Sequence, residues 1–250
     1  MATLQSYDGT LRRRFQHREV ESTVEKVYST TIDKCGDYSK PPELPTWNKR
    51  ETLRLHREIN ATADTLRELS PMEDPETISP EGIIRRLFPD PETLLCIGRS
   101  NREFKTATLA GFDDLKNHQF IVAAPMIARW GKTQTGKPSQ HTKEATGPRA
   151  YIVCDFDDPP PEQHPSIIMQ LMKFRGAALV LSSGGKSKHA WFPTTPHTDR
   201  DRIFWRTCLA LGADPALYRN HSQFVRMPNG TRDNGKPQEV VYFNPNNITQ

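Results

Sequence analysis

An acidic pair closes a continuous apolar stretch of the chain, in the run "YIVCDFDDPP". Asp155 and Asp157 are spaced i, i+2 at the end of a predicted strand, and the two-residue period of a strand sends both carboxylates to the same sheet face. Two like charges held that close are unfavourable unless a cation lies between them. Oxygen ligands suit Mg²⁺ or Mn²⁺, so the pair is a candidate metal site. The alternative is that these acids end a strand before a proline-rich turn, which Asp158 caps.

The second stretch is "SSGGKSKHAWF", residues 182–192. Its Gly-Lys-Ser resembles the end of a phosphate-binding P-loop, but the first glycine of such a loop would fall at Val180, and a strand follows where a helix is needed. The glycines favour a β-hairpin turn, because they permit positive φ. Two interpretations stay open: a flexible turn with solvated lysines, or a turn in which the backbone, Lys186, Ser187 and His189 hold phosphate oxygens.

A third carboxylate and several cations follow the last predicted helix, in "GADPALYRNHSQFVRMPNGTRDNGK". Asp214 comes soon after the helix, Arg226 lies in the next predicted strand, and Arg232 and Lys236 follow in a polar turn. Nucleotidyl transfer needs such groups, because metal ions bridge the attacking and leaving oxygens while basic side chains neutralise the triphosphate. The alternative is that Asp214 is a turn residue and Arg226 a surface residue of its strand.

The elements that would hold these residues alternate between strands and helices from Tyr151 onward. Strands are predicted at "YIVCDF", "AALVLSS", "HAWF", "QFVRM" and "QEVVYFN". Helices are predicted at "PEQHPSIIMQLMKFRG", closed by Gly176, and at "TDRDRIFWRTCLALG", with Thr198 and Asp201 at a capping-box-like start and Gly212 at its end. The order predicts an α+β fold with an RRM-like βαββαβ core, an antiparallel or mixed sheet and helices on one face.

The composition and the predicted secondary structure of the chain change near residue 80. Residues 1–80 are polar and are predicted to form a helical or extended accessory module, with one clear helix over residues 48–69. The apolar positions of this helix fall near one face: Leu53, Leu55, Ile59, Ala63, Leu66 and Leu69. Residues 81–250 are predicted to form the catalytic domain, which begins with a short helix at "EGIIRRLF" and strands at "TLLCIG" and "QFIVAAP".

A long, glycine-rich, basic segment, "RWGKTQTGKPSQHTKEATGPR", precedes the acidic strand. It is too long for an ordinary connector, so it is either a functional loop or disordered. We expect four of its cations to follow the phosphate backbone of a nucleic-acid strand: Lys132, Lys137, Lys143 and Arg149. The alternative is a solvated loop with no such role.

The composition is that of a polar, mildly basic globular protein. Of 250 residues, 35% are hydrophobic and 26% are charged, with a formal net charge of +4 that fits a polyanionic partner. No apolar run approaches the roughly 20 residues of a membrane span. The cysteines do not have the spacing of a zinc site, and we expect buried, reduced thiols in a cytoplasmic protein. These cysteines are Cys35, Cys96, Cys154 and Cys208.

Taken together, the three stretches resemble the motifs of the archaeo-eukaryotic primase superfamily, of the primase-polymerase type. The motifs of that family are a strand-end acidic pair, a Ser-x-His and a later acidic residue, which here would be "DFD", "SKH" and Asp214. The "SGGKS-HAWF" and "RMP-G" blocks are similar to those of replication primases from bacterial mobile elements and phages. The resemblance covers roughly residues 85–245 and leaves Asp233 and Asn220 open as alternatives to Asp214.

What the resemblance implies is template-directed polymerisation of nucleotides by a DNA primase or primase-polymerase. Asp155, Asp157 and Asp214 would hold two divalent ions, Mg²⁺ or Mn²⁺, and His189 would join them as a catalytic residue. The incoming NTP or dNTP would be bound by a partly overlapping set: Lys186, Ser187, His189, Arg226 and Lys236. The implied partners are a single-stranded DNA template and a helicase, separate or fused in a longer parent, and no membrane.

Two other functions stay open. One is a replication-initiation module on the same fold, which binds nucleotide and DNA with little or no polymerase activity. The other is a rolling-circle nicking enzyme, which needs a His-hydrophobic-His metal pair and a nucleophilic tyrosine, whereas "KHAWF" has one histidine. The three acids and the Ser-x-His favour an active polymerase over both.

Overall fold

The computed structural model of the protein describes residues 43–195 and 198–248. The chain divides into two compact units, Met1–Leu44 and Pro45–Gln250. The boundary expected at residue 80 does not coincide with this division. Predictions that fall on residues 1–42, including Cys35, lie outside the described residues, as does the predicted cap by the side chain of Thr198.

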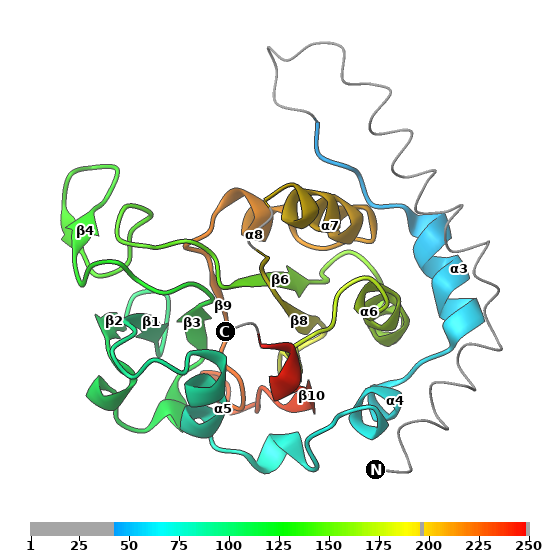
Figure 1. Cartoon of the computed structure of the whole chain (residues 1–250), viewed down its shortest axis with the longest axis horizontal. Coiled ribbons are helices and arrows are strands. Elements are labelled where there is room, and N and C mark those ends of the chain that lie inside the picture. The colour runs from blue at the N-terminus through cyan, green and yellow to red at the C-terminus, as the bar shows by residue number, and fades with distance from the viewer. Residues whose placement is uncertain (1–42, 196–197, 249–250) are drawn as a thin grey trace. The chain divides into compact units, whose positions relative to one another are not determined.

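Two four-stranded antiparallel sheets form the framework of the second unit (Figure 1). The first sheet has the order β2-β1-β3-β9, with bounds β1 Leu95–Gly98, β2 Phe104–Ala107, β3 Phe120–Val122 and β9 Phe224–Arg226. The second has the order β10-β7-β8-β6, with bounds β6 Tyr151–Asp155, β7 Leu179–Ser182, β8 Lys188–Pro193 and β10 Val240–Phe243. A separate two-stranded sheet pairs β4 (Gly131–Lys132) with β5 (Pro138–Ser139).

The α+β class is confirmed, but the RRM-like arrangement is not. In the second sheet β8 lies between β6 and β7, as a split βαβ unit requires, and every pairing is antiparallel. However, β10 joins the outer edge of β7, whereas an RRM-like sheet places its last strand beside its first. The "QFVRM" strand, β9, leaves this sheet and pairs with β3 in the other. Such long-range pairing is not encoded in the local pattern of either strand.

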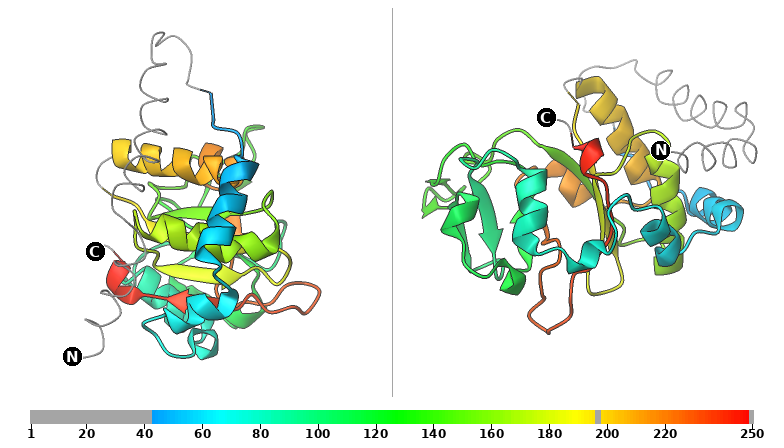
Figure 2. Two further views of the ribbon diagram at one scale, coloured as in Figure 1. Left: turned by 90° about the vertical axis from the view of Figure 1, so that its right-hand side faces the viewer. Right: turned by 60° about the horizontal axis from the view of Figure 1, so that its bottom comes forward.

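The second sheet is covered differently on its two faces (Figure 2). One face carries α6 (His164–Met172) and α7 (Thr198–Ala210), and there the Phe192 ring packs edge-on against Phe204, with centroids 4.9 Å apart. The other face carries Tyr151, whose hydroxyl donates to the Leu87 carbonyl of α5 (Pro80–Leu87) at 2.6 Å. Burial on both faces explains why the sequence of β6 is apolar without alternation.

The helix predicted over residues 48–69 is two helices, α3 (Lys49–Ile59) and α4 (Ala63–Glu68). Asn60 ends α3 in the left-handed conformation, with φ 49°, and Thr62 begins α4 with a capping box that it shares with Thr65. Asn tolerates the left-handed region better than most residues, so the break falls within an otherwise helical apolar period. Because α3 packs on α6, and α4 packs on both α6 and β10, this region belongs to the second unit.

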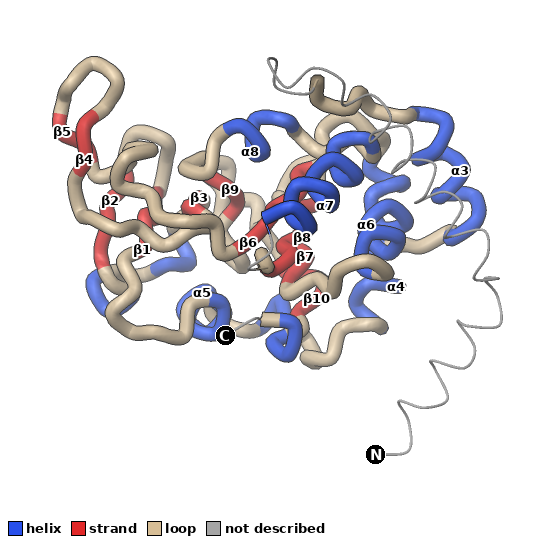
Figure 3. The backbone as a smooth tube through the Cα atoms, turned by 45° about the horizontal axis from the view of Figure 1, so that its top comes forward, coloured by secondary structure: helices blue, strands red, loops and turns tan. Residues whose placement is uncertain are grey.

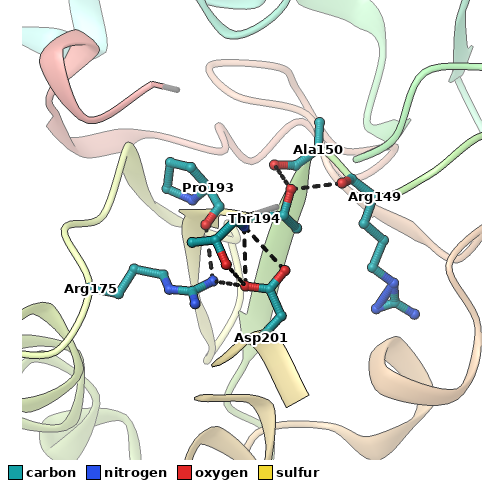
Figure 4. Close-up of polar contacts among 7 residues, drawn as sticks. Arg149, Ala150, Arg175, Pro193, Thr194 and Asp201 are labelled. Atoms are coloured by element: carbon teal, nitrogen blue, oxygen red, sulfur yellow. Dashed lines mark hydrogen bonds and ion pairs between the residues drawn. The ribbon is translucent and has the colours of Figure 1, made fainter. Parts of the chain in front are cut away.

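A cluster of polar contacts fastens the end of β8 to the start of α7 (Figure 4). Oδ1 of Asp201 accepts from Nη1 of Arg175 at 2.6 Å and from the Thr195 hydroxyl at 3.0 Å. The same Arg175 nitrogen donates to the Pro193 carbonyl at 3.1 Å. Asp201, expected at a helix cap, is therefore the acceptor that joins two segments of the chain.

The structure describes three of the four cysteines. Cys96, Cys154 and Cys208 are buried and carry no disulfide. No helix in the described ranges is long and apolar enough to span a membrane.

Candidate active site

The acidic strand and the Ser-x-His strand lie side by side. In the register of β6 and β8, Asp155 is directly opposite His189, so their side chains share one face of the sheet. Nε2 of His189 lies 3.0 Å from Oδ2 of Asp155, an ion-pair separation at which the ring N–H is not aligned for a hydrogen bond. Two motifs that are distant in the sequence therefore meet at one pair of atoms.

Asp155 combines an unpartnered oxygen with a lowered pKa. Its Oδ1 is buried and has no hydrogen-bond partner among the residues that the structure describes. Burial alone would raise the pKa of this carboxyl, but the charge of His189, polar contacts with His189 and Ser187, and the charge of Arg226 hold the pKa below its ordinary value. At neutral pH Asp155 is therefore an anion with one oxygen left for a further partner.

Asp157 and Asp214 complete an acidic cluster with Asp155. Phe156, between the two acids of the pair, is fully buried and forms a β-bridge with Ala213. Next to this bridge, the N–H of Asp214 donates to the Asp155 carbonyl at 2.8 Å. Burial and the charges of Asp155 and Asp214 raise the pKa of Asp157. The acids predicted from two separate stretches therefore lie close enough for Asp155 and Asp214 each to repel Asp157.

Asp214 has a structural role as well. It is the N-cap of α8 (Pro215–Arg219), and its Oδ1 accepts from the Ala216 N–H at 2.8 Å. Asp214 thus acts as a turn residue that caps a helix and also contributes its charge to the acidic cluster. Helix α8 was not predicted, although Asp-Pro is a recognised start signal for a helix.

The Gly-Gly-Lys-Ser stretch forms the predicted hairpin turn between β7 and β8. Gly184 has φ +70°, and a Cβ at this position would lie 2.6 Å from the Pro237 carbonyl oxygen, so both the backbone and the space require glycine. The Ser187 hydroxyl is buried and donates to the Ser183 hydroxyl at 3.2 Å, whereas Lys186 is exposed. Ser187 is thus held in place, and Lys186 is accessible to a ligand.

Arg226 brings positive charge to the acids from the other sheet. Its guanidinium lies 4.7 Å from the centre of the Phe120 ring, and Nη1 donates to Oε1 of Gln119 at 3.3 Å. Burial lowers the pKa of Arg226 although the charges of Asp155 and Asp157 oppose this effect. The acidic cluster is therefore faced by a cation whose position depends on the β3–β9 pairing.

Arg232 is a second cation of the site. The sequence predicted it in a polar turn but did not assign it to a ligand. It lies in a turn closed by a bridge between Thr231 and Pro237, and Nη1 donates to the Ser183 carbonyl at 3.5 Å. A Cβ at Gly185 would lie 2.9 Å from that Nη1, so the two turns are in contact. Lys236, in the same turn, is exposed. The signal that could have identified Arg232 is its pairing with a Gly-Gly turn, which only the fold reveals.

The two alternatives to Asp214 are placed differently. Asn220 accepts through Oδ1 from the Ser222 hydroxyl at 2.9 Å. Asp233 is exposed in the turn beside Arg232, and its charge acts on Arg226. Of the three candidates, Asp214 is the one whose charge acts on Asp157.

The four cations of the long basic loop divide into two kinds. Lys132, Lys137 and Lys143 are exposed. Arg149 instead donates to the Tyr218 carbonyl at 2.8 Å and lies 5.3 Å from the centre of the Trp205 ring. A nucleic acid would therefore compete with an internal contact at Arg149 but not at the lysines.

A divalent ion suits the chemistry of the acidic cluster, although the cluster is not a finished cage. Within residues 43–195 and 198–248, no three His, Cys, Asp or Glu side chains gather closely enough to hold a metal ion by themselves. The open Oδ1 of Asp155 and the repulsion at Asp157 are nevertheless the features that a cation with oxygen ligands would relieve. Asp155 and Asp157 therefore suit a divalent ion, whose remaining ligands would have to come from Asp214, water or a substrate phosphate.

Comparisons with known proteins complete the description of the site. No family model matches the chain, and no curated protein matches it. Among solved structures, the chain is similar to one titled "Cyanophage S-2L Primase-Polymerase (PrimPol), AEP domain (PP-N190)", with 16% sequence identity and a TM-score of 0.41 over 66% of this chain and 92% of that chain. A likeness of this degree supports no conclusion about fold or activity.

Proposed function

We propose that this chain is a nucleotidyltransferase of the primase-polymerase type, which joins nucleotides on a single-stranded DNA template. One observation carries the proposal: Asp155, Asp157 and Asp214 cluster at the end of β6, with His189 on Asp155 and Arg226 facing the acids. Nucleotidyl transfer needs acids and cations side by side, because metal ions and a triphosphate must be held together. The resemblance of the three motifs to primase-polymerases of mobile elements and phages supports the same function.

The residues of the site divide into two working groups. Asp155 and Asp157, with Asp214, would hold Mg²⁺ or Mn²⁺, which when bound supplies charge neutralisation at the attacking and leaving oxygens. Arg226 and Arg232 would bind the phosphates of the incoming NTP or dNTP. Three further residues would complete the phosphate site from the two turns: Lys186, Ser187 and Lys236.

His189 has a more specific role in this proposal. It is buried, and its contact with Asp155 lowers the pKa of that carboxyl. An ionised Asp155 is the form that binds a metal ion. His189 would therefore keep Asp155 charged and present its remaining ring nitrogen to the site.

A synthesis assay tests the proposal. The full chain is incubated with a single-stranded template, Mn²⁺ or Mg²⁺, and labelled NTP or dNTP, with and without an annealed primer. We expect either dinucleotide formation or primer extension that depends on the template. A helicase, separate or fused in a longer parent, would be the functional partner in replication, and the assay does not require it.

A second candidate is a nucleotide- and DNA-binding replication-initiation module with little or no polymerase activity. Two observations favour it: Oδ1 of Asp214 is occupied as the cap of α8, and no three His, Cys, Asp or Glu side chains of the described residues gather closely enough to hold a metal ion. Absence of product at every metal concentration, with DNA binding retained, would assign this function instead.

A further inference from the structure

The long basic loop begins with an exposed tryptophan. Ile127 and Trp130 are the two most exposed large apolar side chains among the described residues, at 68% and 59%. By contrast, Trp191 and Trp205 are buried in the core. A tryptophan offers a large flat surface that can bury a large area against a ligand.

The charge around this tryptophan is mostly positive, and one acid lies close to it, Glu144, whose Oε2 accepts from the Lys132 N–H at 3.0 Å. Between Ile127 and Lys143 the chain has no Asp or Glu. Its Lys and Arg residues in this interval are all exposed: Arg129, Lys132, Lys137 and Lys143. Trp130 thus lies in a field that attracts a polyanion and repels a basic partner. An aromatic surface between cations is what proteins use to bind single-stranded nucleic acid, because bases stack while the backbone is neutralised.

The loop is held in a defined conformation, so the exposure of Trp130 does not come from a loose segment. The hairpin of β4 and β5 projects beyond the first sheet (Figure 3). Its turn is closed by the Thr133 N–H, which donates to the Lys137 carbonyl at 2.9 Å. Its far end is fixed to β2, because the Thr106 N–H and hydroxyl both donate to Gln140, each at 2.6 Å. The alternative of a disordered loop is therefore wrong for this segment.

A chain of ring contacts joins the loop to the acidic cluster. The His141 ring lies 4.1 Å from the Phe224 ring of β9. Phe224 lies 5.7 Å from Phe120, which in turn lies under the guanidinium of Arg226. Arg226 acts electrostatically on Asp155. A ligand bound to the loop would therefore lie on a segment that packs, through His141, on β9, the strand that carries Arg226.

We propose that Trp130 is a stacking platform for the bases of a single-stranded DNA, with Arg129, Lys132 and Lys137 binding its phosphates. The inference rests on the proposed function in that this strand would be the template. Single-stranded DNA fits better than a duplex, because a duplex hides the base faces. It also fits better than a protein, because two apolar side chains are too small an area for a stable protein interface.

The test is the affinity of the full chain for a labelled oligo-dT, measured by fluorescence anisotropy without nucleotide or metal. Trp130→Ala should weaken binding about tenfold, the loss expected for one stacked base at about 1.4 kcal/mol. Trp130→Phe should stay within about threefold of the wild type, because a ring remains. Phe174→Ala, which removes another exposed aromatic ring, is the matched control and should not change the affinity.

Salt dependence separates stacking from charge. Trp130→Ala should leave the slope of log Kd against log salt unchanged. The double substitution Lys132→Ala with Lys137→Ala should reduce the slope by about 1.4, at about 0.7 per phosphate contact on a single strand. If Trp130→Ala does not fold, photocrosslinking of bromodeoxyuridine oligomers to the wild type gives the answer, with Trp130 as the expected site.

Wild-type affinity in Trp130→Ala would overturn the inference, and so would crosslinks confined to other segments. A changed oligomeric state of Trp130→Ala with unchanged affinity would also overturn it, and would show that the loop is an interface between copies of the chain. The binding assay is independent of synthesis. Tryptophan-dependent binding without product would refute the proposed function alone. Product formation with tryptophan-independent binding would refute this inference alone.

Discussion

Two aspartates of similar exposure differ in how fully their carboxylate oxygens are hydrogen-bonded. Asp201 and Asp155 are 17% and 19% exposed, and each lies beside one basic side chain, Arg175 and His189 respectively. Oδ1 of Asp201 accepts from both Arg175 and Thr195, and its Oδ2 accepts from the Thr195 N–H at 3.2 Å. Oδ1 of Asp155 has no such partner within the described residues. The first carboxylate is satisfied by the fold, and the second is left incomplete.

The difference indicates what each region is for. Buried polar atoms in folded proteins are nearly always bonded, so an exception calls for a ligand or a catalytic role. Next to Asp155, burial and the charges of Asp155 and Asp214 raise the pKa of Asp157, and a bound cation would relieve the repulsion among these charges. Asp201 should therefore matter for stability, and Asp155 for activity.

The largest effect is expected from removing the acidic pair. Asp155→Ala combined with Asp157→Ala should reduce synthesis about a thousandfold, equivalent to about 4 kcal/mol of transition-state stabilisation. The urea midpoint should change little, because the repulsion at Asp157 is removed together with the favourable interactions of Asp155 with His189 and Arg226. Asp158→Ala, at the adjacent exposed acid, is the control and should retain synthesis. Primer extension by the double variant at the wild-type rate would show that the site is assigned wrongly.

Asp201→Ala should have the opposite profile. It leaves the largely buried guanidinium of Arg175 without its carboxylate, and the free energy of unfolding should fall by about 3 kcal/mol in urea titrations. Synthesis per folded molecule should not change. Asp199→Ala breaks the exposed pair with Arg202 on the same helix and should cost under about 0.5 kcal/mol. Equal losses in the two variants would contradict the distinction drawn here.

Metal binding should sharpen the comparison without reference to activity. Mn²⁺ at about ten times its Kd should stabilise the wild type by about 1.4 kcal/mol, seen as a rise in Tm. The Asp201→Ala variant should keep this increment, although it starts from a lower Tm. The Asp155→Ala, Asp157→Ala variant should lose the increment, and an unchanged increment there would place the metal elsewhere.

The smallest effect concerns the opposite end of β6. Tyr151 donates to Leu87, and burial raises the pKa of its phenol well above the unfolded value of about 10. The neutral form is the one stabilised by folding, so this contribution is complete below about pH 10 and is lost as the pH rises toward the folded pKa.

Tyr151→Phe should lower the free energy of unfolding by about 1 kcal/mol at neutral pH, leave synthesis unchanged, and reduce the loss of stability above pH 10. Urea titrations at pH 7 and pH 10.5 measure both effects. An identical alkaline loss in wild type and variant would mean that Tyr151 does not titrate in this way.

The strands of the site could be predicted because their patterns are local. "YIVCDF" and "HAWF" are apolar runs, and the hairpin was predictable from two glycines, so Asp155 and His189 could be assigned to strands in advance. The partner of β9 could not, since its pairing with β3 spans a long stretch of chain, and the role of Arg232 depends on the contact between two turns. The break at Asn60 was missed because a left-handed residue leaves the apolar period on both sides intact.

The hydrogen bond from the Asp214 N–H to the Asp155 carbonyl joins two residues that are far apart in the sequence. The chain between these two residues forms one long excursion, which begins and ends at this hydrogen bond. The excursion includes α6, the Gly-Gly hairpin and α7. The separation of the first and third acids is therefore a local quantity, insensitive to the length of the chain between them. A label or a second domain could therefore be inserted into a surface loop between these two residues without changing the spacing of Asp155 and Asp214.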